Sequence, residues 1–398
     1  MAIMTEITGK ALTPAARMAR LGTESAFEVL AAARKLEAEG KNVVHLEIGE
    51  PDFDTPPNIV EAGIKALKGG FTHYGPSAGL PEVREAIARD ISKRRGISAK
   101  AEQVVITPGA KPIMFFTILA LVNDGDEVIY PDPGFPIYES VIEFLGARPV
   151  PIQLREENDF RLDVDELESK FTDKTRLLII NSPHNPTGSV LTPADLEAIA
   201  AVCGDRQVPV LADEIYNRIL YDGEHRSIWT YPGMDELTII LDGMSKTYAM
   251  TGWRLGYGVM PEKLATGVAR LMTNSNSCTA SFSQMAMLEA INGDQSGVDK
   301  MVSEFRARRD LVVKLLNEID GVTCRTPAGA FYVFPNVKSF KKKSRELGEY
   351  LLQTGHVATL GGTAFGGGGE GYLRLSYANS KEQITEGVRR MKAALAKL

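Results

Sequence analysis

Compact apolar runs rich in Val and Ile recur between residues 104 and 260. They lack a strict alternation of apolar and polar positions, and this pattern is typical of strands that are buried on both faces. Helical patterns over 193–203 and 261–272 lie between some of these runs. Strands that alternate with helices predict an α/β domain with a mostly parallel sheet. The predicted strands cover residues 104–107, 127–130, 176–181, 208–213, 238–242 and 256–260.

The N-terminal part of the chain predicts two helices that end at glycines. A helix over 23–39 stops at Gly40, and a helix over 80–95 stops at Gly96. Between them, the prolines of residues 49–57 predict a loop, because proline does not fit inside a helix or a central strand. This region is therefore expected to add helices and a loop ahead of the first buried strand.

The pattern changes after about residue 297. A long, charged, amphipathic helix over 298–319 is followed by short strands at 330–334 and 372–376 and a closing helix over 381–397. This order predicts a smaller α+β domain, on which the N-terminal helix is expected to pack. The expected organisation is a large domain over 43–296, with helices on both faces of its sheet, and a smaller domain built from 1–42 and 297–398.

Composition narrows the class of protein. A chain of 398 residues that is 44% hydrophobic and 24% charged suits a soluble globular protein of about two domains. A net charge of −6 argues against nucleic acid as a partner. Three cysteines without a CxxC motif and five histidines without an HExxH motif predict neither a disulfide framework nor a metal site. The longest apolar stretch, 113–122, is too short to cross a membrane, so we expect a cytoplasmic protein.

Polar side chains follow several of the predicted strands at the point where each strand ends. Asn181 and Asn185 follow one strand, Asp213 ends the next, and Ser245 and Lys246 come directly after the third. Ligands of open α/β sheets bind outside the carboxyl ends of the strands. We therefore expect these side chains to meet at one rim of the sheet although they are far apart in sequence.

The segment GMSKTYAMTGWRLGY, residues 243–257, is the most specific of these. A lysine that is shielded from water loses its proton more easily and becomes a nucleophile toward carbonyl groups, which is a use for Lys246. Ser245 and Arg254 are suited to hold a phosphate, the arginine with two parallel hydrogen bonds. Considered alone, the motif also fits a surface lysine in a loop.

Three further segments add candidate ligands. Asp213 could pair with a protonated pyridine nitrogen and Tyr216 could bond a ring hydroxyl, although Asp213 would also serve as a helix cap. The turn TPGAK, residues 107–111, leads from a strand into a helix, so its backbone N–H groups suit a phosphate. Phe135, in PDPGFPIY, could stack on an aromatic ring or simply pack in the core.

Together these segments resemble the fold-type I pyridoxal-5′-phosphate enzymes, and within them the class I aminotransferases related to aspartate aminotransferase. The resemblance covers nearly the whole chain. It is carried by motifs in a fixed order, namely LEIGEPDFDTP, THYGPSAGLPEVREAI, TPGAK, NPTG, ADEIY, SKTYAMTGWRLGYG and YLRLSYA. It implies transfer of an amino group from an L-amino acid to a 2-oxo acid, with 2-oxoglutarate as the expected acceptor.

The resemblance also implies roles for individual residues. Lys246 matches the lysine that carries the cofactor and moves the Cα proton, and Asp213 matches the partner of the ring nitrogen. The other residues that it implies for the cofactor are Tyr216 and Asn185 at the ring hydroxyl, Phe135 on the ring face, and Gly109, Ala110, Lys111, Ser245 and Arg254 near the phosphate. Those that it implies for the substrate are Gly49, Phe135, Asn185 and Arg374, of which Arg374 binds the α-carboxylate. Tyr74 matches a tyrosine that reaches the phosphate of a neighbouring subunit, which implies a homodimer.

The identity of the amino donor depends on Lys111. In some relatives of aspartate aminotransferase a lysine in this turn contacts the distal carboxylate of an acidic substrate, which makes aspartate the first expectation. Lys111 could equally face solvent or support the phosphate. Phe135, Ile48 and Phe365 could instead line an apolar pocket for an aromatic amino acid or alanine. A cysteine-S-conjugate β-lyase is a further alternative, because the same fold and lysine support elimination.

Two departures from the family pattern carry expectations of their own. His184 stands inside NSPHNPTG, where we expect it to pack or to support its neighbours rather than to catalyse. Residues 360–369 are rich in glycine, which raises the conformational entropy lost on ordering. This loop and the N-terminal segment are therefore expected to move when substrate binds. About forty residues that read as one helix precede the first motif, so a ligand-sensing domain of a transcription regulator is not favoured.

Overall fold

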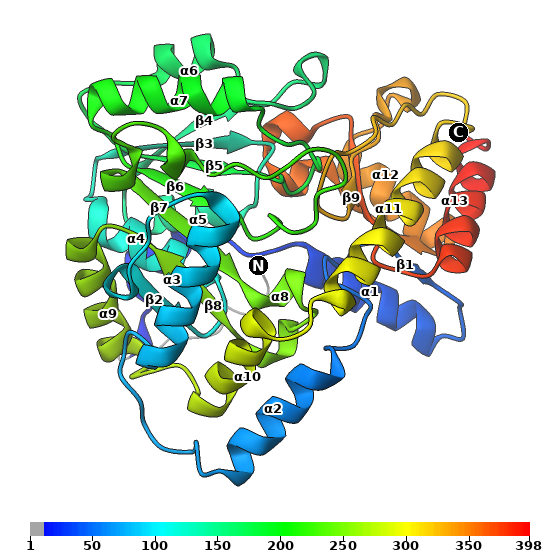
Figure 1. Ribbon diagram of the computed structural model, residues 1–398. Helices are drawn as coiled ribbons and strands as arrows, with labels where there is room; N and C mark the ends of the chain where they lie inside the picture. The colour runs from blue at the N-terminus through cyan, green and yellow to red at the C-terminus, as the bar shows by residue number, and fades with distance from the viewer. Residues whose placement is uncertain (1–11) are drawn as a thin grey trace.

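The computed structural model describes residues 12–398, and its centre is a seven-stranded sheet (Figure 1). Four strand pairs are parallel, and β8 alone runs antiparallel to its two neighbours. The predicted mostly parallel sheet is therefore confirmed. In spatial order the strands are β2 (Val104–Thr107), β8 (Gly256–Val259), β7 (Thr238–Gly243), β6 (Val210–Asp213), β5 (Thr175–Asn181), β3 (Glu127–Asp132) and β4 (Arg148–Gln153).

Strand β4 is the one member of this sheet that the sequence pattern did not predict. Its sequence RPVPIQ contains Pro149 and Pro151, which argue against a central strand because proline lacks the N–H that a ladder needs. The structure accommodates both prolines because β4 lies at the edge and pairs only with β3. One side of the strand therefore needs no ladder hydrogen bonds.

The two faces of the sheet pack in different cores, as strands buried on both sides require. On β5, Leu177 and Ile179 pack with α4 (Lys111–Leu121) and α5 (Ile137–Phe144). Leu178 and Ile180 point the other way and pack with α7 (Pro193–Arg206), beside α6 (Val164–Lys170). Figure 1 shows α6 and α7 together on one side of the strands. The remaining helices around the sheet are α2 (Pro57–Lys68), α3 (Pro81–Arg95), α9 (Glu262–Ser275) and α10 (Ser281–Asn292).

The C-terminal part of the chain forms a second group of elements, and the predicted boundaries of the two domains stay a prediction. It contains α11 (Ser296–Leu316), α12 (Ser344–Tyr350), α13 (Lys381–Leu395) and a small antiparallel sheet of β11 (Leu360–Gly361), β12 (Leu373–Ser376) and β9 (Tyr332–Val333). Helix α1 (Ala26–Ala38) packs on this group, since its Ala33 and Leu36 share a buried apolar cluster with Leu352 and Ala358. Strand β1 (Val44–His45) pairs with β10 (Val357–Ala358), so the chain joins this group again just after α1.

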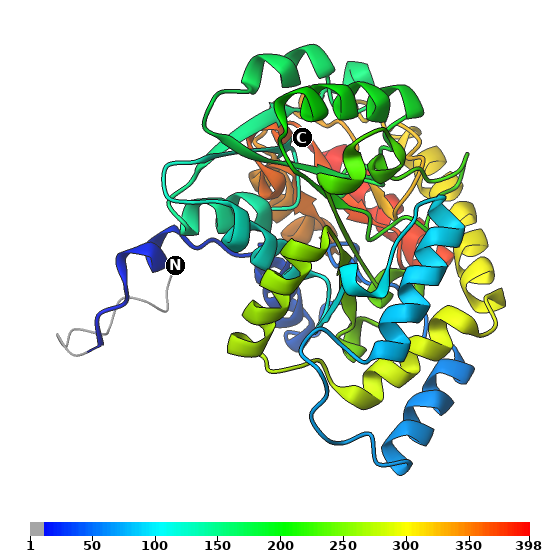
Figure 2. The same ribbon diagram turned by 60° about the vertical axis from the view of Figure 1, so that its left-hand side comes forward.

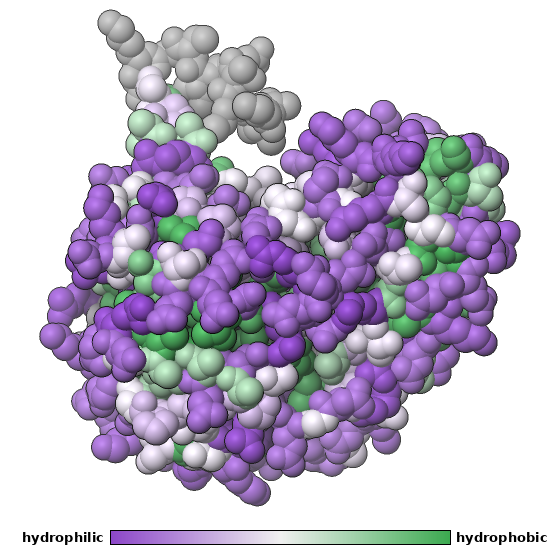
Figure 3. All heavy atoms as spheres, turned by 90° about the horizontal axis from the view of Figure 1, so that it is seen from above, coloured by the Kyte–Doolittle hydropathy of each residue, from purple (hydrophilic) through white to green (hydrophobic). Residues whose placement is uncertain are grey.

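The first described residues, drawn in dark blue, project from the body of the molecule in Figure 2, and the chain then turns back to α5 and the start of α1. The segment before α1 is attached at two points on α5: Arg20 Nε donates to the Glu143 carbonyl at 2.7 Å, and Gly22 N donates to Ser140 Oγ at 2.9 Å. The face drawn in Figure 3 is mostly hydrophilic, with hydrophobic residues visible between the polar ones. Within residues 12–398 no helix is long and apolar enough to cross a membrane.

A buried cluster of charges ties α3 to the strand ends of the large sheet. Arg95, at the end of α3, donates short hydrogen bonds to Glu214 and to Asp242. The two carboxylates have further donors, because Tyr257 Oη lies 2.8 Å from Asp242 and Ser227 Oγ lies 2.6 Å from Glu214. Glu214 follows β6 and Asp242 lies in β7, so a single guanidinium joins two neighbouring strand ends.

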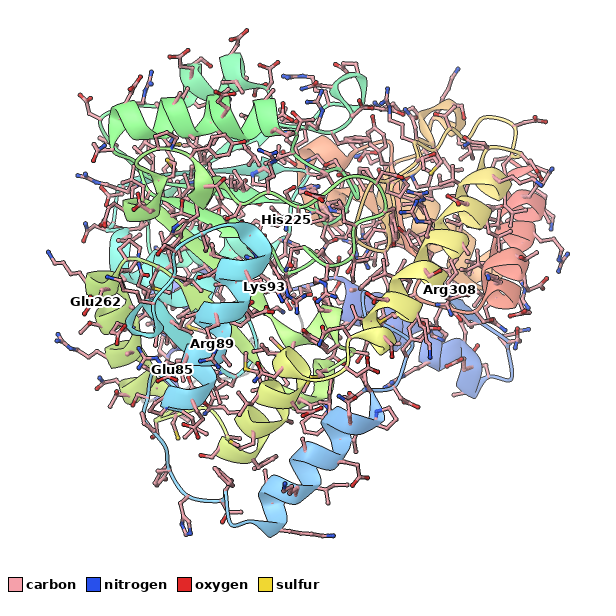
Figure 4. The ribbon with its side chains drawn as sticks, viewed as in Figure 1. Glu85, Arg89, Lys93, His225, Glu262 and Arg308 are labelled. Carbon is pink, nitrogen blue, oxygen red and sulfur yellow. The ribbon has the colours of Figure 1, made fainter. Side chains whose placement is uncertain are left out.

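Replacing Arg95 by Met is expected to lower the free energy of unfolding by about 3–5 kcal/mol, because two buried carboxylates would lose the guanidinium they share and only Glu214 would keep a basic neighbour, His225. Urea unfolding followed by circular dichroism measures this change. The matched control is Arg89→Met on the same helix, where the pair with Glu85 has side chains 66% and 60% exposed (Figure 4). That control is expected to cost at most about 1 kcal/mol. Equal losses for the two variants would contradict the role given to Arg95.

Candidate active site

The predicted rim is the mouth of a cavity of about 380 Å³. It lies where β5, β6 and β7 end side by side, and Asn185, Asp213 and Lys246 all line it. The predicted site residues that line this cavity are Gly49, Ala110, Lys111, Phe135, Asn185, Asp213, Tyr216, Ser245, Lys246, Arg254 and Arg374. The structure therefore brings together residues from seven separate sequence segments.

Gly109 and Tyr74 do not line the cavity. Gly109 lies directly behind it, since a Cβ atom at this position would meet the guanidinium of Arg254, and its φ of +89° is a conformation that glycine favours. Tyr74 is 90% exposed in the connection between α2 and α3. An exposed tyrosine outside its own cavity is available to a neighbouring molecule, but its contact with a partner subunit stays a prediction.

Lys246 lines the cavity just beyond the end of β7. It lies in α8 (Met244–Thr247), a single turn that follows β7 without a linker, and its Nζ donates to the Gly49 carbonyl at 2.5 Å. Burial lowers the pKa of Lys246 to about 8, although the negative charge of Glu50 opposes the shift. A lysine with this pKa loses its proton near neutral pH, which suits a nucleophile or a general base.

Asp213 lies at the end of β6, on the same cavity wall. Its Oδ2 accepts from the Tyr138 hydroxyl at 2.6 Å and its Oδ1 accepts from the Ile215 backbone N–H at 3.2 Å. Burial raises the pKa of Asp213 to about 6, and these two hydrogen bonds act against that shift. In the described chain no basic side chain pairs with this carboxylate. It is therefore suited to meet a cation that enters the cavity.

Arg374, on β12, closes the cavity from the C-terminal part of the chain. Its guanidinium donates to the Glu47 carbonyl and, at 3.4 Å, to Asn185 Oδ1. It also lies 4.6 Å from the ring centroid of Tyr332 and 4.9 Å from that of Phe365. Its Nε is buried and has no partner among residues 12–398. A buried donor left open in this way fits a carboxylate ligand, which arginine binds through a planar fork.

The turn at the start of α4, which also lines the cavity, has the features of an anion seat. Helix α4 starts at Lys111 with Ala110 as its cap residue, and the backbone N–H groups of a helix start favour a negative charge. Gly256 allows β8 to approach this turn, because a Cβ there would overlap the backbone of Gly109 and Ala110. Arg254 is held nearby by a hydrogen bond from Nη1 to the Thr251 carbonyl at 2.8 Å.

Lys111 lies inside the same cavity, where it has two partners. Its Nζ forms an ion pair with Glu24, in the segment before α1, and lies 5.3 Å from the ring centroid of Phe135. Lys111 lines the cavity while its side chain is 52% exposed, so its contact with a substrate carboxylate stays a prediction. Glu24 was not predicted, because nothing in its local sequence marks it as part of a site.

Two buried tyrosines also escaped prediction. Tyr138 donates a hydrogen bond to Asp213. The hydroxyl groups of Tyr332 and Tyr216 are hydrogen-bonded to each other at 2.8 Å. A Cβ at Gly49 would overlap the Tyr332 hydroxyl, so the glycine and the tyrosine fit as a pair. The motif PDPGFPIY contains Tyr138, three residues after Phe135, which was a usable signal. Tyr332 lies in an apolar strand and its sequence gives no such signal.

His184 is not among the residues that line the cavity. It is buried, and its Nδ1 is 2.8 Å from Thr187 Oγ1. Burial lowers the pKa of His184 to about 3, so the ring is neutral at physiological pH. A neutral imidazole bound to its own loop supports the NPTG turn rather than the chemistry.

These features define an α/β enzyme whose cavity combines a half-buried lysine, an unpaired carboxylate and two groups of anion-binding donors. The chain belongs to the class I and II aminotransferases, whose family model matches residues 41–391. It is therefore an enzyme that transfers amino groups between amino acids and 2-oxo acids, which confirms the activity predicted from the motifs.

Individual relatives differ in their named substrates. An aspartate aminotransferase from Pyrococcus abyssi is 43% identical over 359 residues, which cover 89% of this chain and 92% of the relative. Aromatic-amino-acid aminotransferase 2 from Thermococcus litoralis is 42% identical over the same shares of the two chains. The crystal structure of the aspartate aminotransferase from Rhizobium meliloti matches with a TM-score of 0.93 at 35% identity, covering 97% of this chain and 100% of that one.

The raised pKa of Asp213 predicts a pH effect on stability. The Asp213 carboxyl is protonated more readily in the folded state than in the unfolded state. Its protonation therefore adds to the unfolding free energy in full below about pH 4, and this contribution is lost as the pH rises through about 6. In the cofactor-free protein, Asp213→Asn abolishes this pH-dependent loss of stability, because an amide does not ionise. Between pH 4 and pH 7 the variant is expected to gain about 2–3 kcal/mol in unfolding free energy relative to the wild type.

Denaturant unfolding at several pH values measures this gain. Asp235→Asn, at an exposed aspartate outside the cavity, serves as the control and is expected to run parallel to the wild type. A constant difference between Asp213→Asn and the wild type across the same pH range would contradict the assignment.

Proposed function

We propose that this aminotransferase carries pyridoxal 5′-phosphate on Lys246, prefers aspartate as amino donor and uses 2-oxoglutarate as acceptor. The observation that supports it most is a pair of ionisable groups in one cavity, the half-buried Lys246 and the buried Asp213, whose pKa values burial shifts in opposite directions. An amine that loses its proton readily suits the aldehyde of pyridoxal phosphate. A carboxylate without a cation suits the protonated ring nitrogen of the same cofactor.

The residues of the cavity fit this cofactor. Asp213 would bind the ring nitrogen, Tyr216 and Asn185 the ring hydroxyl, and Phe135 one face of the ring. The phosphate would occupy the anion seat formed by the turn at Gly109 and Ala110 together with Ser245 and Arg254. When bound, the cofactor supplies an electron sink that stabilises negative charge at the Cα atom of the substrate.

Two side chains would then act on the substrate directly. Arg374 binds the α-carboxylate, and its open Nε and planar fork orient the Cα–H bond within the cavity. Lys246 Nζ takes the Cα proton as a general base and, once protonated, donates it again as a general acid. Its pKa of about 8 permits both steps near neutral pH.

The preference for aspartate is supported by Lys111, which places a cation in the cavity, and by the relatives named for aspartate. Aromatic amino acids are a second candidate, because Phe27, Phe135 and Phe365 also line the cavity and one relative is named for aromatic substrates. Alanine transfer and β-lyase activity use the same lysine. A lyase would release pyruvate and ammonia without any oxo acid.

The experiment that tests the proposal is an absorption spectrum of the purified protein, loaded with pyridoxal phosphate and exposed to single amino acids without an oxo acid. The cofactor band is expected to shift with aspartate and to return when 2-oxoglutarate is added. Lys246→Ala is expected to lower the rate of this shift by about 10²–10⁴-fold, because the general base is lost. Lys93→Ala, on the outside of α3, is the control (Figure 4).

Other outcomes of this experiment have definite meanings. A shift with phenylalanine or alanine but not with aspartate would replace the proposed donor. Stable absorption with release of pyruvate and ammonia would favour the lyase. A protein that shows no cofactor band after loading would contradict the assignment of Lys246.

We also propose that the active form is a homodimer in which Tyr74 reaches the phosphate of the neighbouring cavity. Its support is the position of Tyr74, which is exposed and remote from its own cavity, and the exposed apolar side chains of the same region, Leu67 and Phe71. Tyr74→Phe is expected to raise the Kd for pyridoxal phosphate about tenfold, through loss of one hydrogen bond to a charged group. Fluorescence titration measures this Kd, and sedimentation shows whether the dimer persists. An unchanged Kd in an intact dimer would contradict the role of Tyr74.

A further inference from the structure

The charged side chains of the cavity can be assigned to partners one by one. Its four cations are Lys111, Lys246, Arg254 and Arg374, and its three carboxylates are Glu24, Glu50 and Asp213. If the proposed function holds, the phosphate uses Arg254, the substrate α-carboxylate uses Arg374, and the aldehyde uses Lys246. Lys111 is then the cation left for a second substrate carboxylate.

Lys111 already has a carboxylate partner within the chain. Glu24 Oε1 forms an ion pair with the ammonium group of Lys111. This ammonium group lies beside the ring of Phe135, which also lines the cavity. In this position Glu24 takes the place that the distal carboxylate of aspartate or 2-oxoglutarate would need. A dicarboxylic substrate and Glu24 therefore compete for one ammonium group.

Displacement of Glu24 costs little elsewhere in the fold. In the described chain its carboxylate has no hydrogen-bond partner besides Lys111. The segment that carries it stays attached through Arg20 and Gly22 on α5, and neither attachment involves the Glu24 side chain. The Lys111 side chain is 52% exposed, so the pair is of the partly solvated kind whose net energy is small.

A substrate with a neutral side chain needs the opposite arrangement. Its apolar atoms would pack against Phe135 and Phe27, next to Lys111. With Glu24 in place, the ammonium keeps a partner while water is excluded around it. Without Glu24 the same substrate would desolvate an unpaired charge, which is costly.

We infer that Glu24 is a specificity-determining residue, an internal carboxylate that neutralises Lys111 for neutral substrates and is displaced by dicarboxylic ones. This inference rests on the proposed function. It gives one cavity two modes of side-chain recognition, with no change in the residues that bind the α-carboxylate or the cofactor. Glu24 thus sets the balance between acidic and aromatic donors.

The test compares two unreactive ligands on the holoenzyme, since binding requires no turnover. Maleate represents the dicarboxylates, and 3-phenylpropionate represents substrates with one carboxylate and an aromatic side chain. Glu24→Gln is expected to lower the Kd for maleate about two- to fivefold, the factor that loss of a partly exposed ion pair supports. It is expected to raise the Kd for 3-phenylpropionate, because the bound aromatic ring would then desolvate a Lys111 ammonium group that has lost its partner.

Two further variants complete the comparison. Lys111→Met is expected to raise the Kd for maleate about 10- to 100-fold, because a charge-assisted bond is lost, and to leave 3-phenylpropionate binding intact. Glu28→Gln removes the same charge from an exposed position of α1 and is expected to change neither Kd. The same ranking is expected in single-turnover rates with aspartate and phenylalanine.

An unchanged or weaker affinity for maleate in Glu24→Gln would overturn the inference, because Glu24 would then hold Lys111 in place rather than compete for it. Equal changes for both ligands would overturn it as well. Failure of the proposed function has a different signature. If no amino acid changes the cofactor spectrum, that function is lost, and the two Kd values still decide whether Glu24 competes for Lys111.

Discussion

The hydrogen-bonded register of β5, β6 and β7 is the constraint on which the site depends. It places Asn181 opposite Asp213 and Asp213 opposite Leu241, so the three strands end at one level. Two residues later β7 passes into the turn that carries Lys246, which brings the amine to the same edge as the carboxylate. Arg95 reinforces this arrangement from below the rim by joining Glu214 to Asp242.

Burial then gives these groups their chemistry. The same exclusion of water lowers the pKa of Lys246 and raises that of Asp213, since in both cases the charged form is disfavoured. Tyr138 limits the effect on Asp213 by donating a hydrogen bond to its ionised form. The cavity thus holds an acid and a base that both titrate closer to neutrality than their ordinary values. A bound cation beside Asp213 would restore its ionised form.

The walls of the cavity come from parts of the chain that are distant in sequence. Glu24 enters from the segment before α1, Lys111 from the start of α4, and Arg374 from β12. The first two form an ion pair that spans 87 residues, and Arg374 reaches the Glu47 carbonyl across 327 residues. Such long-range contacts build the pocket. One residue that is distant in sequence can therefore change the preference of the pocket for substrate side chains while the catalytic lysine stays the same.

The sequence by itself determined the alternating strands and helices, the family and the main candidates for the site. Buried parallel strands leave an apolar pattern, and residues such as Lys246, Asp213 and Arg374 stand in motifs whose chemistry is local. Only the tertiary structure revealed β4 as an edge strand, because its prolines exclude a central position but not an edge. The tertiary structure also decided the roles of Tyr332 and Glu24, since each acts through a partner that is far away along the chain. A local pattern indicates the type of a residue and the face of the element on which it lies, whereas contacts across 87 or 116 residues exist only once the chain has folded.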